Sequence, residues 1–406
     1  MPLPEIFWQL LLGLYTLAAF VQLVAWWGVF GKIGLRPIHQ STNHQSTNHQ
    51  STNHQSTNHQ STNHQSTNHQ STSILLCARN EAENLSRYLP AVLAQQYESE
   101  WELLVVDDAS EDETPDVLRS FQEKNPERMR VLTIEKKTFQ GKKNALARGI
   151  SAAKYDLFLL TDADCEPASP RWLAHMAAML TAKPEIEIVL GYGPMSQGEK
   201  DPSSSFLVSI FSRYETAFVA AQYFSLARAG MPYMGVGRNL AFKRSIFDRV
   251  GGFSAHAHII SGDDDLLVNA SANARNTAIC LTPESFVYSN SPTSWPAWLR
   301  QKQRHLAAGT AYRWPHKILL AMLGLSQAGF YFLFAVLVLA GFAPEIVLGV
   351  FLLRFFSVLF VFGKILRVLR DPGLWWQIPL LDPLMAVYYG VVVPWVLVGK
   401  KRVGWR

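Results

Sequence analysis

The residues of this sequence best suited to chemistry are two aspartates that follow a short apolar run. In the segment "LFLLTDADCEP", residues 157–167, Asp162 and Asp164 stand one residue apart where the apolar run ends. Side chains of an extended strand alternate, so the two carboxylates are expected on the same side, about 7 Å apart along the backbone. A nearby cation would remove their repulsion, and Mg²⁺ or Mn²⁺ takes oxygen ligands from carboxylates together with substrate phosphates. The alternative is a strand followed by a turn that aspartates cap.

Polar groups also follow other predicted strands. The run "SILLC" is followed by "ARNE", residues 78–81, and the run "ELLVV" is followed by "DDAS", residues 107–110. A helix expected to begin in "GKKNALARG", residues 141–149, offers backbone amides and two lysines, Lys142 among them, to a phosphate or another anion. Each segment alone could be a helix cap, but their convergence on one crevice favours a binding site.

The elements that would position these residues alternate between strands and helices from residue 73 to about residue 313. Short apolar runs such as "SILLC", "ELLVV", "RVLTI", "LFLL" and "IEIVLG" are separated by stretches of helical periodicity such as "AENLSRYLPAVLAQQ" and "PRWLAHMAAML". Runs without alternation, joined through helices, predict strands buried on both faces of a mostly parallel sheet. In such open sheets the ligand crevice lies outside the carboxyl ends of the strands, which is where Asp162 and Asp164 are expected.

The N-terminal region predicts a membrane anchor. Residues 6–30 contain no charged side chain and exceed the roughly 20 apolar residues that cross a bilayer. The segment begins after Glu5 and ends in bulky aromatics, unlike a cleavable signal peptide. Because Lys32 and Arg36 follow it, the positive-inside rule places the N-terminus outside and the bulk of the chain in the cytoplasm, at the inner membrane.

The C-terminal region predicts two or three further apolar segments. Residues 318–342 are uncharged and long enough to cross a bilayer, whereas residues 346–362 contain Arg354 and residues 378–398 are interrupted by Asp382. A third full crossing would place the basic C-terminal end outside, against the positive-inside rule. We therefore expect two crossings followed by a re-entrant or interfacial segment.

Composition limits the remaining possibilities. Six tandem copies of "STNHQ", residues 41–70, lack apolar residues and predict a disordered linker. The three cysteines have no metal-type spacing. The net charge of +5 forms no basic patch interleaved with aromatics, so no nucleic-acid partner is expected. The predicted organisation is an anchor at residues 1–36, a linker at 37–72, an α/β domain at 73–313 and a membrane region at 314–406.

With these motifs in this order, the sequence resembles the inverting glycosyltransferases of family 2, which have the nucleotide-sugar-binding fold called GT-A. The matching segments run from "SILLCARNEAENL" through "VVDDASEDET", "GKKNALARGI", "TDADCEP", "GVGRNLAFKRSIFDRVGGF" and "SGDDDLLVNA" to "QKQRH", residues 73–305. The resemblance implies a GT-A fold, an α/β fold with a mostly parallel sheet flanked by helices. Here that fold would be combined with the N-terminal and C-terminal transmembrane helices.

The resemblance also implies a donor site. Asp162 and Asp164 would hold a divalent metal, Mg²⁺ or Mn²⁺, on the diphosphate of a nucleotide-sugar donor, for which a UDP-sugar is the family-level expectation. The rest of the donor would contact residues of the other strand ends and of a later helix. The expected donor-binding residues include the metal ligand Asp162. They are Ala78, Asn80, Glu81, Asp107, Asp108, Lys142, Asp162, Gln301 and Arg304.

A later acidic segment would supply the general base. An inverting transfer is a direct displacement at the anomeric carbon, so one carboxylate must take the acceptor's hydroxyl proton while a metal neutralises the leaving diphosphate. In the family this carboxylate lies in a Glu-Asp-x-Asp-Leu-like motif, which reads "GDDDL" at residues 262–266 here. Asp263 is the expected base, and Asp264 is its nearest rival.

Two departures from the family pattern bear on function. Processive members carry Gln-x-x-Arg-Trp, and this chain has His305 in place of the Trp, which disfavours processive synthesis. Arg304 would still meet donor phosphate, and Gln301 would still face the acceptor. Gly262 stands where the family often has Glu, which removes one carboxylate beside the expected base.

The sequence therefore predicts a membrane-bound glycosyltransferase that moves a sugar from a nucleotide sugar to a lipid-linked or envelope-polysaccharide acceptor at the cytoplasmic face. Membrane lipids are expected partners. One alternative is a processive polysaccharide synthase, and another is a non-catalytic nucleotide-sugar sensor or scaffold. The long aromatic segment at residues 206–230 either lies on the membrane beside a lipid acceptor or forms a core helix.

Overall fold

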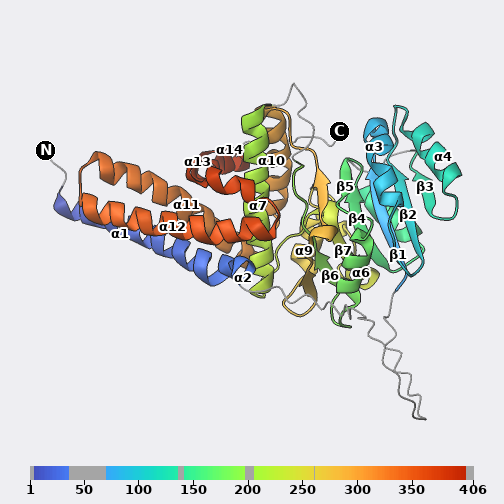
Figure 1. Ribbon diagram of the computed structural model, residues 1–406, viewed down its shortest axis with the longest axis horizontal. Coiled ribbons are helices and arrows are strands. Elements are labelled where there is room, and N and C mark those ends of the chain that lie inside the picture. The colour runs from blue at the N-terminus through green and yellow to red at the C-terminus, as the bar shows by residue number, and fades with distance from the viewer. Residues whose placement is uncertain (1–3, 36–69, 136–140, 197–204, 260, 399–406) are drawn as a thin grey trace, which may run out of the picture.

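The described chain forms an α/β domain, a long helix along its flank and a group of apolar helices that extends away from it (Figure 1). The computed structural model describes residues 4–35, 70–135, 141–196, 205–259 and 261–398. Most of the predicted linker, residues 37–69, lies outside the described residues, as does the basic C-terminal end at residues 399–406.

The α/β domain is built on a seven-stranded sheet with the strand order β3-β2-β1-β4-β7-β6-β8. The neighbours among β1, β2, β3 and β4 are parallel, as predicted, whereas β7 runs antiparallel to both β4 and β6. A separate antiparallel pair joins β5 to β9. The strands are β1 (Thr72–Ala78), β2 (Trp101–Asp107), β3 (Met129–Thr133), β4 (Leu157–Asp162), β5 (Cys165–Pro167), β6 (Ile188–Leu190), β7 (Leu240–Lys243), β8 (Thr277–Ile279) and β9 (Val287–Ser289).

Helices cover the sheet and continue into the apolar group. The α-helices are α1 (Glu5–Leu23), α2 (Gly31–Gly34), α3 (Ala82–Leu93), α4 (Thr114–Lys124), α5 (Lys143–Ala152), α6 (Trp172–Thr181), α7 (Phe206–Arg228), α8 (Arg244–Arg249), α9 (Asp265–Ser271), α10 (Trp295–Gly309), α11 (Trp314–Leu339), α12 (Pro344–Val368), α13 (Ile378–Val387) and α14 (Val393–Val398). Two π-helical stretches, η1 (Val24–Phe30) and η6 (Tyr388–Val392), join α1 to α2 and α13 to α14. The 3-10 turns are η2 (Gly237–Asn239), η3 (Ser254–His256), η4 (Pro283–Ser285) and η5 (Pro372–Gln377).

Both faces of the sheet are buried because side chains alternate along its central strands. Ile74 and Leu76 of β1 belong to a core shared with α3, α4 and α6. Leu75 and Cys77 of the same strand belong to the opposite core, shared with α5, α7 and α9. This double burial explains why the parallel strands read as continuous apolar runs.

The helix α7 lies between the sheet and the apolar helices (Figure 1). Its residue Phe218 packs against Trp26 of η1 and Phe362 of α12, with ring centroids 5.9 Å from each. Arg213, one helical turn and a half earlier, forms an ion pair with Asp371, which follows α12. Most of α7 is buried in this way, so the core-helix interpretation of this segment is confirmed.

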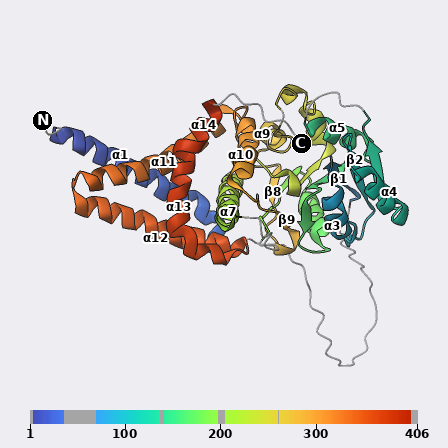
Figure 2. The same ribbon diagram turned by 90° about the horizontal axis from the view of Figure 1, so that it is seen from above.

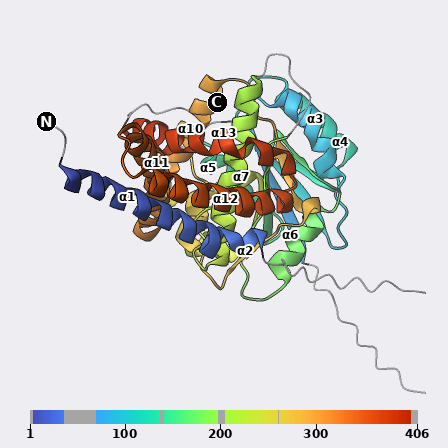
Figure 3. The same cartoon turned by 60° about the vertical axis from the view of Figure 1, so that its left-hand side comes forward.

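Four helical stretches of the described chain are long and apolar enough to cross a membrane: Glu5–Gly34, Trp314–Leu339, Pro344–Val368 and Pro372–Val398. The first three lie side by side, whereas α13 and α14 of the fourth run across α11 and α12 (Figures 2 and 3). We call residues 378–398 the crosswise segment. Its re-entrant or interfacial course relative to a membrane stays a prediction.

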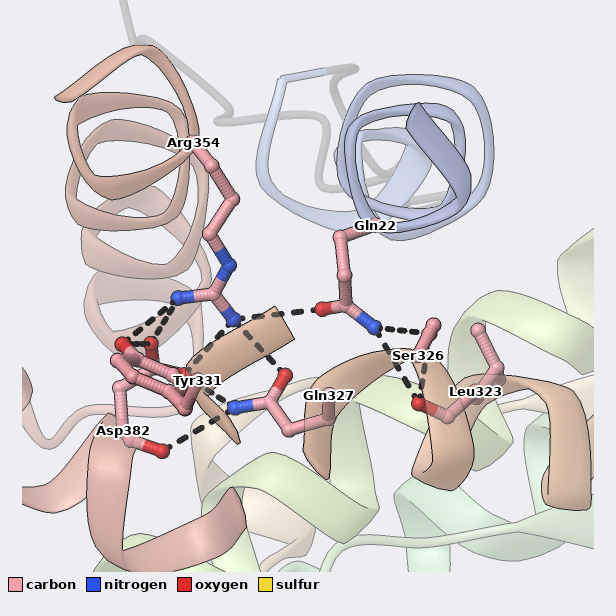
Figure 4. A network of polar contacts seen from close by, with 7 residues as sticks. All are labelled: Gln22, Leu323, Ser326, Gln327, Tyr331, Arg354 and Asp382. Carbon is pink, nitrogen blue, oxygen red and sulfur yellow. Dashed lines mark hydrogen bonds and ion pairs between the residues drawn. The ribbon is translucent and has the colours of Figure 1, made fainter. Parts of the chain in front are cut away.

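A buried polar network joins the crosswise segment to the other apolar helices (Figure 4). Asp382 of α13 pairs with Arg354 of α12, and both side chains are almost fully buried. Asp382 also accepts hydrogen bonds from Tyr331 at 2.5 Å and from Gln327 at 2.8 Å, both in α11. Arg354 donates to Gln22 of α1 at 3.3 Å. The two charged residues that interrupt separate apolar segments of the sequence are therefore each other's partners.

Candidate active site

Asp162 and Asp164 lie where β4 ends and β5 begins, at the carboxyl edge of the parallel strands. One carboxylate oxygen of each and the Sγ atom of Cys165 lie within 4.8 Å of one another. Asp162 also forms an ion pair with Lys142, which immediately precedes α5. The structure therefore brings the aspartate pair and the lysine segment together, as predicted.

The two aspartates differ in their electrostatic surroundings. Burial raises the pKa of Asp164, and the neighbouring Asp162 raises it further. Burial acts in the same direction on Asp162, but Lys142 and nearby arginines outweigh it and lower the pKa of Asp162. Burial also opposes the charge of Lys142, yet Asp162 and Asp263 hold the pKa of Lys142 well above its ordinary value. A cation between the aspartates would relieve the repulsion that acts on Asp164.

The donor atoms at this position suit a hard divalent cation. Mg²⁺ and Mn²⁺ prefer carboxylate oxygens, which Asp162 and Asp164 provide. Cys165 is a poor ligand for such an ion, because burial and the adjacent carboxylates keep the pKa of its thiol well above the ordinary value. The thiol instead donates to Asp164 Oδ1, with a distance of 3.3 Å between the heavy atoms. The residues present thus fit a metal held by the two aspartates.

The loops that follow β1 and β2 carry the predicted nucleoside-binding residues and are tied together by hydrogen bonds. Asn80 has a positive φ of 55°, a conformation that asparagine tolerates better than most residues. Its side-chain oxygen accepts a bond from the backbone of Glu111 at 2.8 Å, and its own N–H donates to Ser110 Oγ at 3.0 Å. Asp107 in turn accepts from the backbone of Ser110 at 3.1 Å. Asn80 and Asp107 therefore shape adjacent strand ends.

The other predicted residues of these strand ends differ in access. Ala78 is fully buried, and its carbonyl accepts from the backbone N–H of Asp108 at 2.9 Å, so its methyl group cannot reach a ligand. Asp108 is fully buried as well. Glu81 lines the cleft that contains Asp162 and Asp164, and burial together with these two carboxylates raises its pKa.

The acidic segment before α9 begins with a glycine that its surroundings require. Gly262 has a φ of +81°, and a Cβ atom at this position would lie 2.7 Å from the Cβ of Ala308 in α10. A glutamate here would meet both the unfavourable backbone conformation and this contact. The departure from the family's Glu therefore follows from the close approach of α10 to this turn.

The three aspartates that follow have different partners. Asp264 caps α9, because its Oδ1 accepts from the backbone N–H of Asp265 at 2.8 Å and its Oδ2 accepts from the backbone N–H of Gly237. Burial and the adjacent Asp263 raise the pKa of Asp264 to about 6. Asp265 accepts from the hydroxyl of Tyr312 at 2.9 Å. Asp263 lines the cleft, and within the described part of the chain its carboxylate makes no hydrogen bond or ion pair.

The helix α10 forms one wall of the cleft with its basic residues. Arg304 lines the cleft close enough to Asp162 to help lower the pKa of that carboxyl. Lys302 is buried and pairs with Glu215 of α7, with 2.5 Å between Nζ and Oε2. His305 lines the cleft. Burial between the cleft walls, together with the positive charges of Lys302 and Arg304, lowers the pKa of His305 well below its ordinary value. His305 is therefore neutral at neutral pH.

The structure differs from the predicted site at several residues. Ala78, Asn80, Asp107 and Asp108 lie at the strand ends but do not line the cleft. Gln301 does not line the cleft, and its side-chain oxygen is buried without a hydrogen-bond partner among the described residues. Arg238 was not predicted but lines the cleft, and its guanidinium donates to the carbonyl of Gly193 at 2.5 and 3.1 Å. Its sequence signal is its place in "GVGRNLAF", a segment of the family resemblance to which no role was attached.

One cleft of about 490 Å³ unites the acidic and basic groups. Asp162, Asp164, Asp263 and Arg304 all line it, although they come from separate parts of the chain. A hollow of about 520 Å³ beside α4 and β3 contains none of them. The convergence of charged side chains, and not the volume, therefore identifies the site.

A mostly parallel sheet with paired aspartates at a strand end, sharing a cleft with a second acidic segment, is the arrangement expected of the nucleotide-sugar-binding GT-A fold. Residues 73–251 match the family model described as "Glycosyl transferase family 2". Over these residues the α/β domain is similar to the family 2 glycosyltransferases, and helices long and apolar enough to cross a membrane lie on both sides of it along the chain.

Two curated bacterial proteins are similar to parts of the chain. "Probable glycosyltransferase YdaM" of Bacillus subtilis (strain 168) is 25% identical over 241 residues, which cover 59% of this chain and 55% of that protein. The poly-beta-1,6-N-acetyl-D-glucosamine synthase of Staphylococcus aureus (strain COL) is 34% identical over 92 residues, which cover 23% of this chain and 21% of that protein. The chain thus spans about half of the first relative and about a fifth of the second.

One solved structure resembles the chain over nearly its whole length. It is the mannosyltransferase PcManGT from Pyrobaculum calidifontis in complex with GDP-Man and Mn²⁺. The TM-score is 0.60, the alignment covers 97% of this chain and 99% of that chain, and 19% of the residues are identical. At this identity the likeness shows a shared fold, which includes the helices outside the sheet.

Proposed function

We propose that this protein is an inverting, metal-dependent glycosyltransferase that moves a sugar from a nucleotide-sugar donor to the hydroxyl group of a lipid-linked or envelope-polysaccharide acceptor. The observation that carries the proposal is the single cleft shared by Asp162, Asp164 and Asp263. Paired carboxylates beside cationic side chains suit a diphosphate with its metal, and a further carboxylate outside that pair suits proton transfer.

The donor diphosphate would lie between the end of β4 and the start of α5. Asp162 and Asp164 would hold the Mg²⁺ or Mn²⁺ ion, which neutralises charge on the leaving diphosphate when bound. Lys142 and Arg304 add positive charge on the same side of the cleft. The loops that contain Asn80 and Asp107 would contact the nucleoside. The family suggests uridine, and because the Pyrobaculum enzyme was solved with GDP-Man, guanosine is the other nucleoside to test.

We assign proton transfer to Asp263. Its carboxylate takes the proton of the acceptor hydroxyl while that oxygen forms a bond to the anomeric carbon. The bond from the anomeric carbon to the diphosphate oxygen breaks on the opposite side, so the configuration inverts and the nucleoside diphosphate leaves. Asp264 is less suited to this role, because both of its oxygens accept backbone hydrogen bonds that fix the start of α9 and Gly237.

The distribution of charge along the apolar helices supports a cytoplasmic catalytic domain. The start of α1 and the catalytic domain lie at opposite ends of these helices (Figure 1). Glu5 and Glu345 belong to the first turns of α1 and α12 at the distant end, whereas Lys32 and Arg367 belong to the ends nearest the domain. The positive-inside rule then places the domain in the cytoplasm, at the inner membrane. A lipid-linked acceptor would be available at that face.

The first test is donor turnover by the purified full-length protein with Mn²⁺ or Mg²⁺ across a panel of UDP-sugars and GDP-sugars. We expect metal-dependent release of nucleoside diphosphate from the wild type. Asp164→Ala should lose metal-dependent donor binding, whereas Asp263→Asn should bind donor without transferring sugar. Asp116→Asn, on the exposed side of α4, is the matched control and should keep both activities. Donor binding without turnover in the wild type, with membrane lipids supplied, would contradict the proposal and favour a sensor.

A processive polysaccharide synthase is the second candidate, because one relative is named as such a synthase. His305 in place of the Trp of processive members argues against it. Mass spectrometry of the product separates the two candidates. A single added sugar supports the proposed function, and a ladder of lengths supports the synthase.

A further inference from the structure

The active cleft extends beyond the groups that the proposed reaction uses. Besides Asp263, its lining includes Gln222 of α7, Leu320 of α11, and Tyr388 and Tyr389 of η6. Leu320 and the two tyrosines belong to helical stretches that are long and apolar enough to cross a membrane. The cleft thus connects the predicted base with the apolar helices.

Specific contacts hold the two tyrosines at the cleft. The hydroxyl of Tyr389 accepts a hydrogen bond from Gln222 Nε2 at 3.3 Å, and the ring of Tyr388 packs on Trp298 of α10 with 5.7 Å between the centroids. Gly324 of α11 permits this arrangement, because a Cβ atom there would lie 3.0 Å from the ring of Tyr389. Both tyrosines stand in a π-helical turn, a widened turn that often occurs at functional sites.

The buried ion pair fixes the segment that carries the tyrosines. Asp382 lies in the same segment, and its carboxylate is held by Arg354, Tyr331 and Gln327 (Figure 4). These partners come from α11 and α12, which the segment crosses (Figure 2). Intramembrane ionisable residues are rare and usually serve a function. Here the pair positions the π-helical turn at the end of the cleft.

We propose that Tyr388, Tyr389 and Gln222 form the acceptor subsite, and that its ligand is a lipid with a hydroxyl-bearing headgroup. The hydroxyl reaches Asp263 through the cleft, while the hydrocarbon chain lies along the part of the cleft lined by Leu320 and the two tyrosines, towards the apolar helices. This inference rests on the proposed transfer to a hydroxyl acceptor. It adds the residues that recognise the acceptor and the chemical class of that acceptor.

Two observations favour a lipid over a water-soluble sugar at this subsite. Val219, Ala220 and Leu320 line the cleft together with the tyrosine rings, and the charges of Glu215 and Lys302 beside them compensate each other in an ion pair, so this part of the cleft offers apolar contacts. On either side of the tyrosines, Val387 and Val391 are 53% and 62% exposed on the outer surface of the crosswise segment. The subsite is therefore separated from the apolar outer surface by this segment alone. An amphipathic molecule matches a cleft that is charged at one end and apolar at the other.

Substitutions at Tyr389 separate acceptor binding from donor chemistry. In vesicles of a bacterial total lipid extract, we expect Tyr389→Ala to need about tenfold more lipid for half-maximal nucleotide release. Donor hydrolysis without lipid is measured on the same variant, so that a loss of acceptor binding can be told apart from a loss of donor chemistry. Tyr389→Phe keeps the ring and loses only the bond from Gln222, so it should lie near the wild type. Val391→Ala, on the outer surface of the same turn, is the matched control and should change neither rate.

A photo-crosslinking residue gives a readout that does not depend on turnover. With p-benzoylphenylalanine in place of Tyr389, irradiation in the same vesicles should give lipid adducts that mass spectrometry finds enriched in hydroxyl-bearing lipid, relative to adducts formed from position 391. No adduct at position 389, or the same adducts as at position 391, would overturn the inference, as would an unchanged lipid requirement in Tyr389→Ala. Absent donor turnover in the wild type would contradict the proposed function instead, and the adducts would still decide whether the subsite binds lipid.

Discussion

Two carboxylate sites in this protein differ in how their charge is compensated: Asp162 and Asp164 are open to the cleft, whereas Asp382 is buried among the apolar helices. At the carboxyl edge of the sheet, Asp162 and Asp164 lie so close that burial and repulsion raise the pKa of Asp164. Among the apolar helices, both carboxylate oxygens of Asp382 have protein partners, including Arg354. The first group leaves charge for a ligand to compensate, whereas the protein itself compensates the second. Charge that is left uncompensated and open to the cleft, more than acidity, therefore distinguishes the proposed ligand site from the structural one.

The largest effect on activity should follow from neutralising Asp263, whose carboxylate lines the cleft without a hydrogen bond or ion pair among the described residues. We expect Asp263→Asn to lower the rate of transfer by about 10³-fold, because general base catalysis commonly contributes that much. Donor affinity should stay near the wild-type value, since the substitution is isosteric and outside the metal pair. Single-turnover transfer assays and calorimetric donor titration measure the two quantities. If the transfer rate fell by less than tenfold, we would conclude that Asp264, and not Asp263, is the general base.

Breaking the compensated pair should cost stability rather than chemistry. Arg354→Met leaves Asp382 buried and uncompensated, which typically costs about 3 to 5 kcal/mol in the free energy of unfolding. Arg354→Met combined with Asp382→Leu removes both charges and should recover much of the loss. Thermal unfolding in detergent micelles compares the three proteins. If the single substitution proved as stable as the wild type, the pair would not be what holds the crosswise segment.

Loss of a charge from the pair Asp162 and Asp164 should change stability in the opposite direction to loss of a charge from the ion pair of Arg354 and Asp382. Asp164→Asn removes a metal ligand, and we expect Mn²⁺-dependent donor affinity to fall by about 10²-fold to 10³-fold. The same change removes a repelled charge, so the unfolding temperature at neutral pH should rise. Donor titration with and without Mn²⁺, together with thermal unfolding, checks both parts. A lower unfolding temperature would show that Asp164 is compensated after all.

The strand-end site was the more predictable of the two regions, because its signals are local. Asp162 and Asp164 follow an apolar run directly, and alternation along a strand places them on one side. The ion pair could not be found in this way. Arg354 and Asp382 are 28 residues apart and lie in separate apolar segments, where each reads as an interruption. Only the packing of α12 against the crosswise segment shows that the two charged residues form an ion pair with each other.

Two details of the catalytic site also depend on contacts that are distant along the chain. Arg238 reaches the metal pair because β7 enters the sheet antiparallel beside β4, and sequence periodicity does not reveal strand order. Asp263 and Asp264 are adjacent and identical in type, so their roles could not be separated before the hydrogen bond from Gly237 to Asp264 was seen. The sequence thus predicts which groups converge, whereas tertiary packing decides which of them stays available.

The pH dependence of stability should reveal the burial of Asp264 and its repulsion by Asp263, which together outweigh the opposite effect of its backbone hydrogen bonds. Its pKa is raised to about 6 in the folded protein, so its contribution to stability is complete below about pH 4 and is lost as pH rises through 6. Asp264→Asn lacks this titration. We therefore expect the wild type's stability, measured relative to the variant, to fall by up to about 3 kcal/mol between pH 4 and pH 7. Denaturant unfolding at several pH values measures this difference. A difference that stays constant with pH would contradict a raised pKa for Asp264.

The smallest predicted effect concerns the turn that precedes these aspartates. Gly262→Ala introduces a side chain at positive φ and against Ala308, and should cost about 1 to 2 kcal/mol in the free energy of unfolding. Combining it with Ala308→Gly removes the contact but not the backbone strain, so recovery should be partial. Denaturant unfolding compares the two variants with Ala308→Gly alone. Full stability in Gly262→Ala would mean that α10 does not restrict this position.

The first apolar helix shares a core with the catalytic domain. Trp26 is fully buried between Phe218 of α7 and Phe362 of α12. Deleting the anchor to obtain a soluble enzyme would therefore uncover aromatic side chains of the catalytic unit and favour aggregation. Likewise, a protease that cut the chain after α1 and α2 would separate the α/β domain from part of its own core. The proposed membrane attachment is thus part of the folded α/β unit and cannot be removed without loss of its packing.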